Sequence, residues 1–278
     1  MIGVESKKPI KLTLPLALVL TLVLCLMSST QPAHAVSNGG YAHPEMIIQP
    51  GELKTLIEKK DPAIRIIDVR EKLQYLSGHI PGAVQVWRPD IEDKMHALPG
   101  MVAAQSQVEE LMGDLGINRQ NTIIIYSDGP DNGRLWWVLA YYGFPMKQMK
   151  LLDGGIDGWK AKGYPTEMVP QAAAKTVFTF PKGSKGVRTM LCTLSDVKSA
   201  LKRPDKVVLD VRSKEEFSGT ETKKGAARPG RIPGVTWIEW KEVLVEAGPY
   251  KGYWKSGDEI KNLFSAKGVT PDKDIYMY

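Results

Sequence analysis

The chain has 278 residues, enough for two domains of ordinary size, and a net charge of +6 at neutral pH. This charge is too mild to indicate a nucleic-acid-binding protein, and no basic run interleaved with aromatic residues appears. The two cysteines and four histidines lack the spacing of a zinc site, so we expect no bound metal. We also expect no cofactor.

Residues 1–35 have the three parts of a secretory signal peptide. The segment has three lysines within its first eleven residues, continues with an almost unbroken apolar run over 14–27, and ends with Ala33-His34-Ala35. The run is shorter than the roughly 20 residues of a membrane span, although a retained anchor is the alternative. We expect a periplasmic or secreted protein that has no membrane contact after cleavage. Cys192 would then be its only cysteine, so no internal disulfide is expected.

Strand and helix patterns alternate from residue 50 to residue 162. Apolar runs predict strands, and apolar residues three or four apart predict helices. The expected order is helix 50–59, strand 64–69, helix 71–76, strand 83–87, helix 105–115, strand 122–126, helix 134–142, strand 150–152 and helix 154–162. This alternation predicts a parallel sheet with helices on both faces.

Residues 165–188 are rich in Pro, Ala and Gly, which indicates an extended connector. The alternation then begins again. The second series is helix 194–201, strand 207–211, helix 213–217, strand 235–238, helix 256–267 and a strand that starts at residue 274.

The second series repeats the first. Asp68 and Arg70 correspond to Asp210 and Arg212 at an offset of 142 residues, and each pair lies at the carboxyl end of a predicted strand. The Gly-x-Ile-Pro-Gly turns at 78–82 and 230–234 match at an offset of 152, so ten extra residues lie between them in the second copy. The offset of 152 also matches Tyr126 with Tyr278. Because the first repeat continues for roughly 40 residues past its copy of that tyrosine, we expect the second to be truncated.

These motifs closely resemble those of the rhodanese family, specifically the tandem-domain thiosulfate and 3-mercaptopyruvate sulfurtransferases. The matching stretches are 68–83, 152–159, 210–220 and 228–235. The resemblance implies an α/β fold with two rhodanese-like domains, each a parallel sheet flanked by helices on both faces, the second incomplete. We place the first domain at 45–167, a linker at 168–188 and the second domain at 189–278.

The resemblance also implies a chemistry. In this family a cysteine of the second domain follows the strand equivalent to 274–278, and the surrounding backbone amides favour its thiolate. The thiolate takes a sulfane sulfur from a small anionic donor as a persulfide and passes it to a thiol or to cyanide. We therefore expect the nucleophilic cysteine directly after Tyr278, and no sulfur transfer by the chain as it stands. The first domain has Ser127 at this position, where we expect a satisfied loop hydroxyl.

Arg212 matches the family's substrate-binding arginine, because a guanidinium suits the oxyanions of thiosulfate or a carboxylate. The alternative is an ion pair with Glu215 or Glu216. We expect Asp210 to accept hydrogen bonds from turn amides, and Cys192 to be a small buried residue. Arg231 replaces the histidine that family members often have before Ile-Pro-Gly, represented in the first copy by His79.

Two other functions remain open on the sequence. One is a non-catalytic exported module that uses the same fold to bind a partner or an anion. The other, a more distant alternative, is a phosphatase with a related Cys-loop-Arg geometry. Residue 279 discriminates between the first two, since cysteine favours the enzyme and Asp, Ser or Gly favours the binding module. The sequence does not discriminate between thiosulfate and mercaptopyruvate as the donor.

Overall fold

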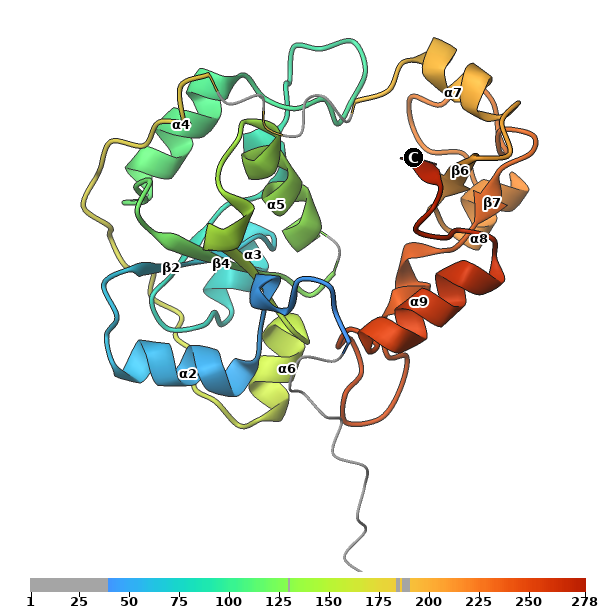
Figure 1. Ribbon diagram of the computed structural model, residues 1–278. Helices are drawn as coiled ribbons and strands as arrows, with labels where there is room; N and C mark the ends of the chain where they lie inside the picture. Colours follow the sequence, from blue (N-terminus) through green and yellow to red (C-terminus); the bar gives the residue numbers. More distant parts are fainter. Residues whose placement is uncertain (1–39, 130, 184–185, 187–190) are drawn as a thin grey trace, which may run out of the picture. The chain divides into compact units, whose positions relative to one another are not determined.

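The computed structural model describes residues 40–129, 131–183, 186 and 191–278, which form two parallel sheets (Figure 1). The predicted signal peptide lies outside the described residues. No helix in the described part of the chain is long and apolar enough to cross a membrane.

The first sheet has five strands in the order β1-β5-β4-β2-β3, and all neighbouring pairs are parallel. The strands are β1 (Ile47–Ile48), β2 (Ile64–Asp68), β3 (Ala83–Gln85), β4 (Thr122–Tyr126) and β5 (Met149–Leu152). Central β4 lies between β5 and β2, and its residues 123–126 are completely buried. The sequence pattern predicted four of these strands. It missed β1, because two residues are too few to show a period.

Helices cover both faces of this sheet, as predicted. Ile66 and Ile67 of β2 point to opposite faces, because successive side chains of a strand alternate. The Ile66 face packs against α2 (Pro50–Glu58), α3 (Lys72–Leu76) and α6 (Gly155–Ala161). The Ile67 face packs against α4 (Gln105–Asp114) and α5 (Asp131–Tyr141). Short 3-10 helices η1 (Pro44–Met46), η2 (Arg88–Ile91) and η3 (Met146–Gln148) complete this part of the chain.

Part of the predicted linker completes the core of the first repeat. Phe178 and Phe180 are buried on the face covered by α4 and α5, where their rings lie 5.6 and 5.2 Å from those of Phe144 and Tyr142. The backbone N–H of Phe180 donates to Glu109 of α4 at 2.8 Å. This segment is therefore extended, as predicted, but it is packed onto the first repeat rather than separated from it.

The second sheet has three parallel strands in the order β7-β6-β8. They are β6 (Lys206–Asp210), β7 (Thr236–Trp237) and β8 (Asp274–Met277), accompanied by α7 (Leu194–Ala200), α8 (Lys214–Ser218), η5 (Trp240–Val243) and α9 (Gly257–Ala266). Its core is small and contains four buried residues, Val207, Leu209, Ile238 and Val269. β8 is an edge strand whose Ile275 and Met277 are 47% and 66% exposed, whereas its counterpart β4 is central and buried.

The structure repeats as the sequence does. Helix α9 spans the ten positions that lie 152 residues after those of α4, and η5 corresponds to η2 at the same offset. Two isolated antiparallel bridges, Glu92–Val102 and Leu244–Trp254, also match. The Ile-Pro-Gly turn ends on a glycine with positive φ in both copies, +79° at Gly82 and +84° at Gly234, a conformation that favours glycine.

Tyr253 and Trp254 of the second repeat contact the first repeat at the start of α6. Tyr253 is buried, and its ring packs on Gly154 and Gly158, where an added Cβ would lie 2.4 to 2.9 Å from its nearest ring and hydroxyl atoms. The backbone N–H of Trp254 donates to Asp153 Oδ1 at 2.9 Å. The aromatic side chains of the helices that flank the first sheet pack on its two cores: Trp136, Trp137, Tyr141, Tyr142 and Trp159.

Candidate functional site

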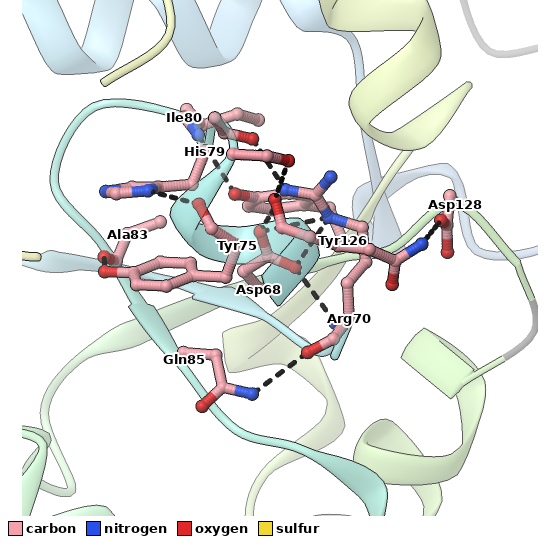
Figure 2. A network of polar contacts seen from close by, with 12 residues as sticks. Asp68, Arg70, Tyr75, His79, Ile80, Ala83, Gln85, Tyr126 and Asp128 are labelled. Atoms are coloured by element: carbon pink, nitrogen blue, oxygen red, sulfur yellow. Dashed lines mark hydrogen bonds and ion pairs between the residues drawn. The ribbon is translucent and has the colours of Figure 1, made fainter. Parts of the chain in front are cut away.

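An ion pair closes the carboxyl end of β2 in the first repeat (Figure 2). Asp68 accepts hydrogen bonds from the backbone N–H of Arg70 at 2.9 Å and from its Nη2 at 2.6 Å. The same Nη2 donates to the carbonyl of Gly78 at 2.8 Å. Both side chains are almost completely buried. This guanidinium therefore links the end of the strand to the start of the Ile-Pro-Gly turn.

Tyr126, the last residue of β4, closes the network from the neighbouring strand (Figure 2). Its hydroxyl accepts from the backbone N–H of Ile80 at 3.0 Å, and its ring lies 5.8 Å from the Arg70 guanidinium carbon. Burial and the adjacent charge of Asp68 raise the pKa of Tyr126 far above its ordinary value, so the phenol stays neutral. The network thus ties two strands and a turn together.

His79 is buried beside this network. Its Nδ1 lies 2.9 Å from the carbonyl of Tyr75, and its ring stacks on the Tyr75 ring at 3.8 Å, which are the contacts of a structural histidine. Its Nε2 faces the Glu167 carboxylate at 3.6 Å, and the two residues exchange backbone hydrogen bonds at 2.9 Å. The turn is therefore held to the end of the first predicted domain.

A pocket of about 190 Å³ lies where the first repeat would hold a nucleophile. It is lined by Val69, Arg70, Glu71, Gln74, Trp87, Ser127, Asp128, Gly129 and Asp131. Ser127 Oγ bonds with both the carbonyl and the N–H of Gly129, so its hydroxyl is satisfied within the loop, as predicted. No general base is among its hydrogen-bond partners in the described residues.

The second repeat builds the same network around β6. Asp210 accepts from the backbone N–H of Arg212 at 3.0 Å, from Nε at 2.9 Å and from Nη2 at 2.6 Å. Nη2 also donates to the Gly230 carbonyl at 3.0 Å. The Tyr278 hydroxyl accepts from the N–H of Ile232 at 3.3 Å, and its ring lies 5.1 Å from the Arg212 guanidinium carbon.

Charge pairing sets the ionisation of this second network. Burial alone would raise the pKa of Asp210, but hydrogen bonds from Arg212 and Tyr278 hold it below its ordinary value. The bond to Asp210 in turn raises the pKa of Arg212. Desolvation raises the pKa of Tyr278. At neutral pH the site therefore has a carboxylate, a guanidinium and a neutral phenol.

The two networks differ in their access to solvent. The Arg70 side chain is 4% exposed, whereas that of Arg212 is 28% exposed. The bonds to Asp210 and Gly230 occupy Nε and Nη2 of Arg212, and Nη1 is not among the atoms they use. The guanidinium of Arg212 is thus the more exposed of the two, and Arg70 also lines the pocket of the first repeat.

Arg231 and His79 occupy the same position before the Ile-Pro-Gly turns of the two copies, and they make similar contacts. Arg231 lies over the ring of Phe217 at 4.4 Å and donates from Nη1 to the Phe217 carbonyl at 3.3 Å. Phe217 is the counterpart of Tyr75, so Arg231 repeats both the stacking and the carbonyl bond of His79. An arginine in place of the histidine therefore leaves the turn tied to the same helix.

Two expectations about the second repeat need correction. Arg212 pairs with Asp210 rather than with Glu215 or Glu216, because the side chain of Glu216 instead accepts from Ser213 at the start of α8. Cys192 is exposed rather than buried, since it lies just before α7, outside any strand or core. The role of Arg212 in binding a substrate stays a prediction.

Sequence reasoning did not find the two tyrosines of these networks. Tyr126 and Tyr278 had been treated only as the last residues of strands. The repeat itself held the signal, since both occur at the offset of 152 that matches the two Ile-Pro-Gly turns. A residue type that recurs at the ends of β4 and β8, beside Asp and Arg, indicates a shared network.

Fold and site together define a duplicated parallel α/β protein with an Asp–Arg–Tyr network at the carboxyl end of each sheet. Residues 49–162 match the family model of the rhodanese-like domain. This match covers the first of the two repeats, from α2 to α6.

Its relatives are similar over most of its length. The chain is 28% identical over 256 residues to the sulfur carrier protein TtuD of Thermus thermophilus, a match that covers 86% of this chain and 84% of that one. It is 28% identical over 230 residues to the 3-mercaptopyruvate sulfurtransferase of Escherichia coli, covering 78% of each. The crystal structure of SseA from Escherichia coli, a 3-mercaptopyruvate sulfurtransferase, superimposes with a TM-score of 0.70 at 27% identity, covering 84% of this chain and 87% of that one. These relatives support a sulfurtransferase function.

Proposed function

We propose that this protein transfers a sulfane sulfur from thiosulfate or 3-mercaptopyruvate to a thiol or cyanide acceptor through a cysteine persulfide. The observation that supports it most is the position of Arg212. Its guanidinium is partly exposed and is oriented by Asp210 beside Tyr278, the residue after which the nucleophile is expected. A fixed guanidinium there suits an anionic donor.

The chemistry requires a thiolate close to Arg212. The thiolate attacks the outer sulfur of thiosulfate, an S–S bond forms, and sulfite leaves with the electron pair of the broken bond. With mercaptopyruvate the leaving group is the enolate of pyruvate, which takes up a proton. The terminal persulfide sulfur then passes to cyanide as thiocyanate, or to a thiol, and the thiolate returns.

Within the described chain no residue supplies this thiolate in the proposed site. Ser127 is the first-repeat counterpart and is engaged by Gly129. Cys192 precedes α7, whereas the site is at the carboxyl ends of β6 and β8. The nucleophile is therefore proposed at residue 279, and residues 1–278 alone are expected to transfer no sulfur.

We further propose export to the periplasm or the exterior through cleavage of residues 1–35. The support is the basic start, the apolar run and the small residues at 33–35. Export should give a mature amino terminus near Val36 in the exported fraction. A retained leader would instead leave the protein in the membrane fraction.

The test is to read codon 279 and assay the gene product. We expect cysteine there, thiocyanate formation from thiosulfate and cyanide, and complete loss of activity when this cysteine is changed to Ser. Arg212→Lys should lower kcat/KM at least about tenfold, because a point charge loses the bidentate geometry held by Asp210. Arg70→Lys, the same change in the first repeat, should alter stability but leave kcat/KM of the folded protein unchanged.

Two outcomes would contradict parts of this proposal. Asp, Ser or Gly at residue 279, with no thiocyanate formed, would overturn the enzymatic proposal and favour an exported binding module. Cysteine at residue 279 together with an Arg212→Lys variant of normal kcat/KM would remove Arg212 from substrate binding.

A further inference from the structure

The guanidinium of Arg70 in the first repeat has one nitrogen that the fold does not use. Its Nε and Nη2 bind Asp68 and the Gly78 carbonyl (Figure 2). Across residues 40–129, 131–183, 186 and 191–278, Nη1 has no hydrogen-bond partner. The buried side-chain atoms without a partner in those residues are His79 Nε2 and Arg134 Nε, so Nη1 is in contact with solvent. A side chain that is only 4% exposed therefore keeps one charged donor for a ligand.

This donor belongs to the wall of a pocket. Arg70 lines the pocket of about 190 Å³ beside the ends of β2 and β4, and every other lining residue also belongs to the first repeat. At ~30 Å³ for each water molecule in the liquid, the pocket holds about six waters, which is the size of a small organic molecule. A charged donor at such a wall gains most from an ionised acceptor, because charge-assisted hydrogen bonds are the strong ones.

Carboxylates supply most of the charge around this pocket. Glu71, Asp128 and Asp131 line it, and Arg70 is the only cation among the lining residues. The charge of Arg70 is already balanced by the ion pair at the end of β2, and Asp131 is balanced by Arg88 at 3.1 Å. This leaves the carboxylates of Glu71 and Asp128. A ligand of the pocket should therefore carry a positive charge as well as an acceptor for Nη1.

Asp128 is the carboxylate closest in effect to the guanidinium. Burial lowers the pKa of Arg70, but the bond to Asp68, helped by nearby charges that include Asp128, holds it above its ordinary value. Oδ2 of Asp128 accepts from Gln74 Nε2 at 2.7 Å, which fixes the carboxylate beside α3 and leaves Oδ1 outside that bond (Figure 2). A donor nitrogen and an acceptor oxygen thus line the same small space.

The lining of this pocket is not a copy of the proposed anion site of the second repeat. The guanidinium is common to both copies, but Glu71 corresponds to Ser213 at the offset of 142, and Trp87 corresponds to Glu239 at the offset of 152. Trp87 is 42% exposed and adds an aromatic wall to the pocket. The first repeat has therefore surrounded the shared guanidinium with groups of its own.

We infer that this pocket binds a small α-amino acid, with the carboxylate on Arg70 Nη1 and the ammonium on Asp128 and Glu71. A simple anion would meet the two remaining carboxylates, and a simple cation would leave Nη1 without an acceptor. A zwitterion satisfies both, and Trp87 offers an apolar wall to a short side chain. The inference does not depend on sulfur transfer, because it assigns a ligand to the repeat that has serine where a nucleophile would lie.

The test is isothermal titration calorimetry of the purified protein with L-alanine as the probe. We expect one site, with a Kd that rises at least about tenfold in Asp128→Asn, because the variant loses a charge-assisted bond to the ammonium. Asp114→Asn, the same change on the surface at the end of α4, should leave the Kd unchanged. Asp128 is exposed, so its variant should unfold at the temperature of the parent.

Two analogues test the charge pattern on the unaltered protein. Propionate lacks the ammonium and ethylammonium lacks the carboxylate, so each should bind at least about tenfold more weakly than alanine. No heat of binding from alanine would overturn the inference. Propionate that binds as tightly as alanine would overturn it too, by making the pocket a plain anion site. Equal Kd values for Asp128→Asn and Asp114→Asn would place the alanine elsewhere, with the same consequence.

Discussion

Each repeat has an Asp–Arg ion pair at the end of a strand, β2 in the first and β6 in the second, and the two pairs differ in how deeply they are buried. Asp68 and Arg70 are closed off from water, whereas Arg212 of the second pair is partly exposed. A buried pair gains little over apolar residues of the same shape, but removing one partner leaves a charge in a medium that cannot solvate it. The first copy is therefore structural, and losing one of its charges should be costly.

We expect Asp68→Asn to lower the free energy of unfolding of the first repeat by about 3–5 kcal/mol. The amide cannot neutralise the buried guanidinium of Arg70, although it keeps the shape of the carboxylate. Urea unfolding followed by circular dichroism measures the loss. Asp114→Asn is the control, because its pair with Lys175 lies on the surface, and it should give no measurable shift of the midpoint. Equal shifts for the two variants would contradict the assignment.

At the scale of elements, α6 presents a face without side chains to the second repeat. Gly154 and Gly158 lie one turn apart, and the ring of Tyr253 occupies the space that two Cβ atoms would fill. Asp153, at the start of this helix, accepts a hydrogen bond from the backbone N–H of Trp254, the residue that follows Tyr253. The φ of Gly158 is not positive, so its backbone conformation does not require glycine. Glycine is needed there because the Tyr253 ring occupies the space of a Cβ atom.

We expect Gly158→Ala to destabilise the protein even though alanine favours a helix. The intrinsic gain of up to about 1 kcal/mol is outweighed because the new Cβ would lie 2.8 Å from the Tyr253 hydroxyl, and that ring is buried. Gly133→Ala in α5 is the matched control, since nothing lies within 4 Å of its Cβ, and it should be neutral or stabilising. Thermal unfolding measures both changes.

A double variant isolates the contact. In a Tyr253→Ala background the space above α6 is empty, so Gly158→Ala should become neutral or stabilising, as at Gly133. If Gly158→Ala remains destabilising without the Tyr253 ring, the clash is with something else, and the contact described here is not the cause.

At the scale of the whole molecule the two repeats are unequal. The first has two buried clusters, one on each face of a five-stranded sheet, and receives Phe178 and Phe180 from the following segment. The second has a single cluster of four buried apolar residues beside a three-stranded sheet. Apolar area removed from water is the main favourable term in folding, so the second repeat is the less stable part of the described chain.

Ile123 and Ile275 occupy matching positions in the two repeats. Replacing each with alanine measures the difference in stability between the repeats. Ile123→Ala should cost about 2–5 kcal/mol, because its side chain is completely buried in central β4. Ile275→Ala in residues 1–278 should cost less than about 1 kcal/mol, since the side chain is already half exposed on edge strand β8. Hydrogen exchange read by mass spectrometry should report the first loss in β2 and β4. A similar cost for both variants would contradict the exposure of β8.

Local pattern was enough to predict the order of the elements. Strand and helix periods are properties of neighbouring residues, and the duplication of 68–70 at 210–212 identified which strands match. The same duplication placed the Asp–Arg pairs at the carboxyl ends of β2 and β6, where the structure has them. Fold class and the location of the candidate site were therefore determined by sequence alone.

The partners of side chains were decided by tertiary structure. Arg212 pairs with Asp210 rather than with Glu215 or Glu216, and the side chain of Glu216 accepts instead from Ser213. Tyr278 became part of the site only when β8 paired with β6, and Tyr253 became an interface residue only when α6 offered two glycines. The contacts of Tyr278 and Tyr253 join segments that are tens of residues apart, and a local period contains no information about which distant surface a side chain will meet.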